Sequence, residues 1–415
     1  MKLVNVYYEG WGERWLLGSL AQDSGYGNGE ILFEYSPQAL NQNLELSPIK
    51  LPLQRAAFSK FPLAQQRLPG LIADSLPDGW GMLLMDRFFR KNGVDVAKVS
   101  PLDRLTFLGH RTMGAITFEP AQDVALLEQD VNLLQLAQQA ERVMAGKDSE
   151  LLAQLVLMGG SPHGARPKVL VDYCQATAEM GMGGTQGVPN GRPWMVKFQS
   201  PGEHKEVCAI ENCYAAMARE CGLEVPATQT FDIAPKLGGF GIARFDVEGG
   251  MRVPVHTLAG VMNADFRMPG TLDYLTYLRA TRTLTRDERE VEKAFARAVF
   301  NVVFHNRDDH PKNFSYRLNN ERHWKLSPAY DLTFSPGPGG YHQMDVMGEA
   351  QAITRKNLLD LAIKADIPAD KALAQLDRHL EVASSYAQTL KAAKVRSATV
   401  KDLAAQVEDN VRRLK

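Results

Sequence analysis

The sequence has few cysteines and no long apolar run. Its four cysteines, Cys174, Cys208, Cys213 and Cys221, include no Cys-x-x-Cys pair, which argues against a zinc site or a disulfide framework and indicates a reducing cytosol. No apolar run approaches the roughly 18 residues of a membrane-spanning helix, so no membrane partner is expected. Polar residues interrupt the segment Met1–Gly10, which is therefore interpreted as a strand and not as a secretion signal. We expect a cytoplasmic protein.

The chain also lacks an excess of charge of either sign. It has 47 Lys and Arg against 48 Asp and Glu, for a net charge of −1. Such a balance argues against a chain that binds nucleic acid non-specifically over its whole surface. Only the segment from Lys391 to the end is locally basic, which is typical of a solvated terminal helix; direct DNA contact by this segment is the less favoured alternative.

The length of 415 residues predicts two to three domain-sized units. Short strands with turns are predicted over residues 1 to about 60, and helices over Met82 to about Lys91 and over Asp103–Leu108. A helical pattern over 123–157 and further strands follow. After about residue 255 the pattern is almost wholly helical. We therefore predict an α+β protein with a sheet-bearing half and a helical half, divided into residues 1–122, 123–250 and 251–415.

The most informative segment, Asn306–Phe314, reads NRDDHPKNF. Phosphoryl transfer needs a carboxylate to orient the attacking hydroxyl, an amide oxygen on Mg²⁺ and a second carboxylate on the metal. Asp308 and Asn313 have the spacing of the Asp and Asn in a protein-kinase catalytic loop, and Asp331 follows after a length that suits a returning hairpin. The alternative base is Asp309, whose spacing to Asn313 is one residue short. The loop alone is equally typical of an Asx turn.

A lysine and a glutamate upstream form a second pattern. Lys197 lies within the apolar stretch 193–199, a predicted strand on which a lone lysine usually faces solvent. Glu211 lies at the edge of the apolar stripe of a predicted helix over 205–221, where an unpaired carboxylate is costly. Kinases pair a strand lysine with a helix glutamate to hold the α- and β-phosphates. We interpret Lys197 and Glu211 as such a pair, with an ordinary salt bridge as the alternative.

A glycine-rich loop, GGSPHGARPK over residues 159–168, precedes a predicted strand over 169–173. Such a loop can direct backbone N–H groups at phosphate oxygens, because glycine allows the backbone to approach closely. It is neither a Gly-x-Gly-x-x-Gly motif nor a Walker A loop. By itself it therefore indicates only a turn.

Together these segments resemble the HipA family, the serine/threonine kinase toxins of bacterial toxin–antitoxin modules. Residues 308–313 resemble the family's Asp-x-His-x-x-Asn catalytic loop, and residues 328–331 resemble its metal-binding segment. Residues 160–168 resemble its glycine-rich loop. The motifs LPDG at 76–79 and LGHRTMGA at 108–115 resemble its N-terminal region.

The resemblance implies a two-lobed, protein-kinase-like fold, in which a mixed α/β N-terminal lobe carries an extra N-terminal subdomain and the C-terminal lobe is all-helical. It implies that Asp308 is the catalytic base, that Asn313 and Asp331 hold Mg²⁺, and that Glu211 positions Lys197. The residues that it implies contact ATP are Gly160, Gly164, Ala165, Lys168, Lys197, His310 and Lys312.

Ser161 matches the serine that family members phosphorylate on themselves, an event that expels the loop and switches the kinase off. The resemblance also implies a protein substrate, since the family's targets include aminoacyl-tRNA synthetases, and a small helix-turn-helix antitoxin through which DNA is contacted indirectly. Arg166 and Pro167 depart from the family's loop. Two alternatives are a small-molecule or lipid phosphotransferase, and a non-catalytic co-repressor bound to a DNA-binding antitoxin.

Overall fold

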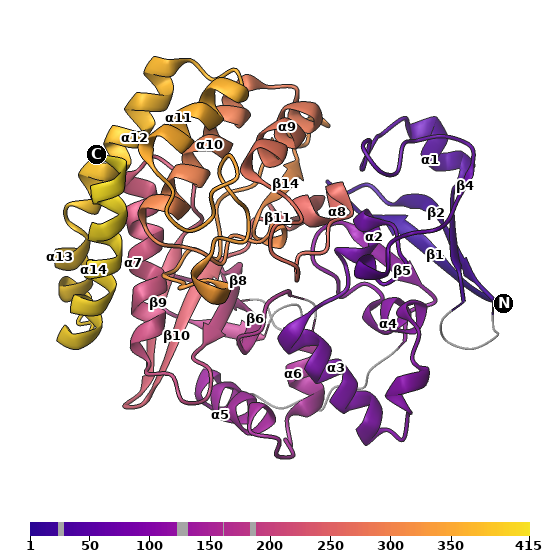
Figure 1. Ribbon diagram of the computed structural model, residues 1–415. Coiled ribbons are helices and arrows are strands. Elements are labelled where there is room, and N and C mark those ends of the chain that lie inside the picture. The colour runs from indigo at the N-terminus through magenta and orange to yellow at the C-terminus, as the bar shows by residue number, and fades with distance from the viewer. Residues whose placement is uncertain (24–28, 123–131, 161, 183–187) are drawn as a thin grey trace. The chain divides into compact units, whose positions relative to one another are not determined.

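The computed structural model describes residues 1–23, 29–122, 132–160, 162–182 and 188–415 (Figure 1). The chain forms two compact units. The first contains Met1–Lys205 and Gln229–Val255, and the second contains Glu206–Thr228 and His256–Lys415. Among the described residues, no helix is both long and apolar enough to cross a membrane.

The first unit begins with a five-stranded sheet in the order β4-β3-β2-β1-β5. Val4, Val6 and Tyr8 of β1 are buried, as the two-residue period of a strand with one covered face predicts. The strands are β1 (Lys2–Tyr8), β2 (Trp15–Gln22), β3 (Ile31–Tyr35), β4 (Ala57–Phe58) and β5 (Ile116–Glu119). The helices of this part are α1 (Pro37–Gln42), η1 (Leu63–Gln65), α2 (Gly70–Ala73), α3 (Gly79–Lys91), η2 (Val96–Lys98) and α4 (Pro101–Leu108).

A second sheet of the first unit has the order β7-β6-β8-β10-β9. The helical pattern predicted over 123–157 is divided in the described residues into α5 (Leu133–Met144) and α6 (Leu152–Gly159), and residues 123–131 lie outside the described part. Gly146, with φ of +82°, lies in the break and cannot continue a right-handed helix. The strands are β6 (Lys168–Tyr173), β7 (Met180–Met182), β8 (Arg192–Phe198), β9 (Thr228–Ala234) and β10 (Leu237–Ala243).

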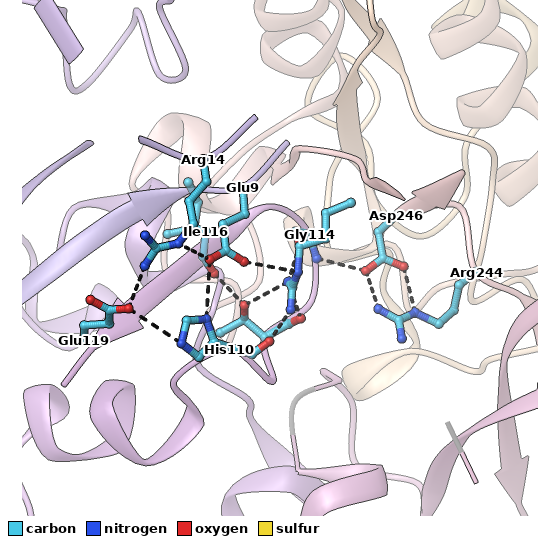
Figure 2. A network of polar contacts seen from close by, with 10 residues as sticks. Glu9, Arg14, His110, Gly114, Ile116, Glu119, Arg244 and Asp246 are labelled. Atoms are coloured by element: carbon cyan, nitrogen blue, oxygen red, sulfur yellow. Dashed lines mark hydrogen bonds and ion pairs between the residues drawn. The ribbon is translucent and has the colours of Figure 1, made fainter. Parts of the chain in front are cut away.

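The motif at 108–115 is held by side chains from much later in the first unit (Figure 2). Arg252, in the short hairpin of β11 (Val247–Glu248) and β12 (Met251–Arg252), donates hydrogen bonds to three backbone carbonyls of this motif. Asp246 accepts a hydrogen bond from the Gly114 nitrogen at 2.9 Å and two from Arg244 at 2.7 and 2.9 Å. Burial opposes ionisation of Asp246, but Arg244 outweighs it and lowers the pKa of the carboxyl group.

The second unit is mostly helical but contains a sheet, so the prediction of an all-helical C-terminal lobe is wrong. Its three-stranded sheet has the order β13-β14-β15. Strands of three or four residues are too short to show a two-residue period clearly, so the hydrophobic pattern of the sequence did not predict them. The elements are β13 (Val255–Thr257), α8 (Leu258–Met262), α9 (Tyr274–Thr285), α10 (Glu288–Val303), η3 (Pro311–Asn313), β14 (Ser315–Leu318), β15 (Trp324–Leu326), η4 (Pro338–Gly340), α11 (Arg355–Lys364), α12 (Ala369–Ala383), α13 (Tyr386–Ala392) and α14 (Ser397–Leu414).

Helix α7 (Glu206–Glu220) lies within one residue of its predicted bounds but groups with the second unit. Tyr214 on its buried face donates a hydrogen bond to the Phe304 carbonyl at 2.6 Å, and its ring packs edge-on against Tyr386. This packing explains why α7 belongs to the second unit although it lies between β8 and β9 of the first unit in the sequence. Burial raises the pKa of Cys213 to about 11, and all four cysteines are buried free thiols, as the sequence indicated.

Candidate active site

Helix α10 ends immediately before the segment that was predicted to be catalytic. The Asn306 nitrogen donates to the Asn301 carbonyl at 2.9 Å, and His305 has φ of +56°, which together form a Schellman cap. Glycine is usual at the left-handed position. Here the His305 ring stacks on Phe334, with 5.0 Å between centroids and 5° between planes, and Nδ1 accepts from Asn410 at 3.1 Å. These contacts fix the direction in which the chain leaves the helix.

The structure separates the two candidate bases, Asp308 and Asp309. The Asp309 side chain is 0% exposed and accepts three hydrogen bonds of 2.7 Å, from Tyr274 Oη, His342 Nδ1 and the Gln343 nitrogen. The Asp308 side chain is 50% exposed and accepts one hydrogen bond from the Gln343 amide at 3.0 Å. Asp309 therefore holds the loop together, and Asp308 is the more accessible of the two carboxylates.

The hairpin of β14 and β15 returns the chain to this loop, as the spacing of Asn313 and Asp331 predicted. The Ser327 nitrogen donates to the Ser315 carbonyl at 2.9 Å, at the base of the hairpin. Tyr330 Oη donates to the Lys312 carbonyl at 2.7 Å. These two hydrogen bonds hold the segment before Asp331 beside the catalytic-loop candidate.

Asp308, Asn313 and Asp331 have the chemistry of a hard-cation site. Burial raises the pKa of Asp308; His310 opposes this shift, and the nearby charges of Asp331 and Asp309 add to it. A cation would relieve this repulsion. Asn313 Nδ2 donates to the Asp308 carbonyl at 2.6 Å, so the amide nitrogen faces the loop and the oxygen lies on the other side. Two carboxylates and one amide oxygen are ligands that Mg²⁺ accepts.

His310 and Lys312 flank the same loop. His310 Nε2 lies 3.8 Å from Asp308 Oδ1, and among the described residues its buried Nδ1 has no hydrogen-bond partner. Lys312 Nζ lies 4.4 Å from the ring centre of Phe266, whose ring also contacts His310. Neither Phe266 nor Gln343 was predictable from the sequence, because a single residue in a loop, with no fixed spacing to the motif, carries no recognisable signal.

Lys168 and Lys197 occupy opposite positions of the paired strands β6 and β8. Both side chains are buried, so Lys197 does not face solvent as a lone strand lysine usually does. Residues directly opposite on an antiparallel pair project to one face, where like charges repel. An anionic ligand such as a triphosphate would stabilise this arrangement. Glu211 is buried on α7 in the second unit, whereas Lys197 belongs to the first, so their pairing stays a prediction.

The described part of the glycine-rich loop, residues 160 and 162–168, connects α6 to β6 in the first unit. Gly164 has φ of +100°, which a residue with a side chain rarely adopts. Ser161, the predicted phosphorylation site, lies outside the described residues. Gly160, Gly164, Ala165 and Lys168 stay predicted nucleotide contacts.

Comparison with protein families gives two matches that together span most of the chain. A model described as the HipA N-terminal domain matches residues 5–119, and one described as the HipA-like C-terminal domain matches residues 160–411. Fold and motifs thus define a HipA-type protein with both of its domains. The chain belongs to the HipA family, which confirms the resemblance seen in its motifs.

A solved structure of HipA from Shewanella oneidensis MR-1, in complex with HipB and operator DNA, shares the fold. Its TM-score is 0.69 at 17% identity, covering 99% of this chain and 97% of that chain. The Helicobacter pylori proinflammatory kinase CtkA gives a TM-score of 0.39 at 12% identity, covering 55% of this chain and 89% of that chain, and this similarity is too low to support an argument. A search of curated proteins found no match.

Proposed function

We propose that this protein is an ATP- and Mg²⁺-dependent serine/threonine protein kinase of a toxin–antitoxin module. The observation that carries the proposal is the pair of adjacent aspartates, of which Asp309 is fully buried and Asp308 is half exposed beside the charge of Asp331. Only the residue with catalytic-loop spacing to Asn313 is accessible. A purely structural role of this polar loop does not account for an exposed carboxylate that is repelled by the charge of Asp331.

In this proposal each residue acts through its charge or its position. Asp308 orients the acceptor hydroxyl and accepts its proton. Asn313 and Asp331 hold Mg²⁺, which when bound neutralises the charge of the transferring phosphoryl group. Glu211 positions Lys197 on the phosphates. The other residues proposed to contact ATP are Gly160, Gly164, Ala165, Lys168, His310 and Lys312.

The proposed partner is a small helix-turn-helix antitoxin. The structural relative from Shewanella oneidensis was solved with HipB and operator DNA, and this chain has the same fold over nearly its whole length. We propose that this chain is cytoplasmic, binds such an antitoxin and contacts DNA through it. We further propose a protein substrate, with an aminoacyl-tRNA synthetase as the first candidate, and inhibition by autophosphorylation of Ser161.

The deciding experiment compares Asp308→Asn and Asp331→Asn with the wild-type protein. Transfer of the γ-phosphate from radiolabelled ATP should fall at least about a thousandfold in both variants, because each removes a charge that acts on the transition state. Circular dichroism should show a retained fold. The matched control is Asp360→Asn, which removes a carboxylate that pairs with Lys356 within α11. Full labelling in both site variants would refute the assignment.

The acceptor is identified by a second measurement. Intact mass before and after incubation with Mg²⁺ and ATP should increase by one phosphate, and peptide mapping should assign it to Ser161. Incubation with cell-lysate proteins and with metabolites then separates a protein kinase from a small-molecule or lipid phosphotransferase. Calorimetry that detects no nucleotide binding would favour the co-repressor alternative.

A further inference from the structure

The segment Leu76–Gly81, which reads LPDGWG, forms hydrogen bonds with the glycine-rich loop within the first unit. Asp78 occupies the N-cap position of α3, where a carboxylate usually accepts hydrogen bonds from the first N–H groups of its own helix. Here the carboxylate accepts a hydrogen bond from the backbone nitrogen of Gly164, which lies 86 residues further along the chain. The Gly164 carbonyl accepts one from the Trp80 nitrogen at 3.0 Å. Both backbone polar groups of Gly164 are thus bound by this segment.

Two further contacts hold the loop on either side of Gly164. His163 Nε2 lies 2.9 Å from the Leu76 carbonyl, at hydrogen-bond distance. The buried indole of Trp80 donates from Nε1 to the Lys168 carbonyl at 2.9 Å, where the loop enters β6. His163, Gly164 and Lys168 of the loop are therefore held by residues from a single short segment.

The glycines of the motif allow this close approach. Gly79 has φ of +40°, and a Cβ there would lie 2.7 Å from both the Ala165 Cα and the Gly164 carbonyl oxygen. A Cβ at Gly81 would lie 2.8 Å from the Gly160 carbonyl oxygen. Contacts below 3 Å with backbone atoms cannot be relieved by a side-chain rotation. The close approach of the loop backbone thus explains why glycine occupies both of these positions in the LPDGWG segment.

We propose that the LPDGWG segment is a positioning element for the glycine-rich loop and that Asp78 is its anchoring residue. The catalytic consequence rests on the proposed kinase function. A glycine-rich loop loses much conformational entropy when it becomes ordered. If the loop is already ordered in the free protein, nucleotide binding does not bear this entropic penalty and is tighter. The segment lies in the match to the HipA N-terminal domain and the loop in the match to the C-terminal domain, so the N-terminal domain shapes the nucleotide site.

The test uses the full-length protein and two measurements. In the absence of nucleotide, hydrogen–deuterium exchange over residues 162–168 should rise in Asp78→Ala, because the Gly164 nitrogen loses its acceptor. In kinase assays, the KM for ATP should rise about tenfold, as expected for a lost hydrogen bond to a charged group, while kcat changes less than about threefold. Asp78→Asn keeps an acceptor oxygen and should restore most of both properties.

A steric variant and two controls complete the design. Gly79→Ala should release the loop as Asp78→Ala does, since its Cβ collides with the loop backbone. Gly93→Ala places a side chain at a φ of +75° with no heavy atom within 4 Å, so it adds backbone strain without touching the loop. Asp95→Ala removes the N-cap carboxylate of η2, which accepts from the Ala97 nitrogen at 3.1 Å. Both controls should leave loop exchange and KM unchanged.

The outcomes separate this inference from the proposed function. Unchanged loop exchange in Asp78→Ala and Gly79→Ala would overturn the positioning role. Tighter ATP binding in Asp78→Ala would also overturn it, since the carboxylate would then compete with phosphate for the loop. Increased loop exchange in a protein whose wild type binds no ATP would support the positioning role and refute the kinase. If Asp78→Ala fails to fold, exchange in Gly79→Ala decides, and unchanged exchange there would overturn the positioning role.

Discussion

Asp308 and Asp309 are neighbours with opposite surroundings, and they should respond differently to the same substitution. Asp309→Asn leaves Tyr274, His342 and the Gln343 nitrogen facing a weaker acceptor in a fully buried site. It should lower the free energy of unfolding by about 3 kcal/mol. Asp308→Asn removes a charge that Asp331 repels, so stability should stay the same or rise. Urea denaturation measures both, and equal losses would contradict the distinction.

His379 should make stability depend on pH. Burial lowers its pKa to about 4, while the unfolded chain titrates near 6.5. The unfolded state therefore binds more protons between these values, and the free energy of unfolding falls as the pH drops from 6.5 to 4. The loss should reach roughly 3 kcal/mol. Urea denaturation at pH 7.5 and 4.5 should show a smaller difference for His379→Leu than for the wild type; an equal difference would contradict the assignment.

At the scale of elements, α7 depends on an anchor at its first residue. Glu206 accepts hydrogen bonds from the Arg396 backbone and side chain at 2.9 Å and from Thr399 at 2.8 Å. Burial opposes its ionisation, but the hydrogen bonds from Arg396 and Thr399 outweigh burial and lower the pKa to about 2. This contribution is therefore lost as the pH falls from about 4.5 to 2.

Removing that anchor gives a measurable prediction. Glu206→Gln should lower the free energy of unfolding by about 2 kcal/mol at neutral pH, because the charge-assisted hydrogen bonds to Arg396 are weakened. Glu220→Gln, at the other end of α7, is the control and should change stability by less than about 0.5 kcal/mol. Thermal denaturation of the three proteins would contradict the prediction if both variants matched the wild type.

Elements with a strong local signal were predictable from the sequence, and those set by distant contacts were not. The apolar stripe of α7 gave bounds within one residue, and the spacing from Asn313 to Asp331 predicted the hairpin. The position of Lys168 opposite Lys197 was not predictable, because it depends on which strands flank β8. The bond between Asp78 and Gly164 joins segments 86 residues apart and leaves no periodic pattern in either.

At the scale of the whole molecule, the charge balance makes a prediction about DNA. A net charge of −1 provides little of the phosphate neutralisation that drives non-specific binding. The isolated protein should therefore bind operator-type DNA only weakly at physiological salt in a fluorescence anisotropy titration. Addition of the proposed antitoxin should recruit it to the DNA. Tight, sequence-specific binding by the isolated chain would contradict the indirect role.

The fit between the LPDGWG turn and the glycine-rich loop limits how the two domains can be recombined. A chimera that joins the N-terminal region of a distant relative to residues 160–411 combines a turn from one protein with a loop from another. Where an alanine replaces either glycine of the turn, the backbones collide even if every side chain thought to act on ATP is present. In this chain the turn and the loop are parts of one polypeptide, so a substitution in either must fit the other.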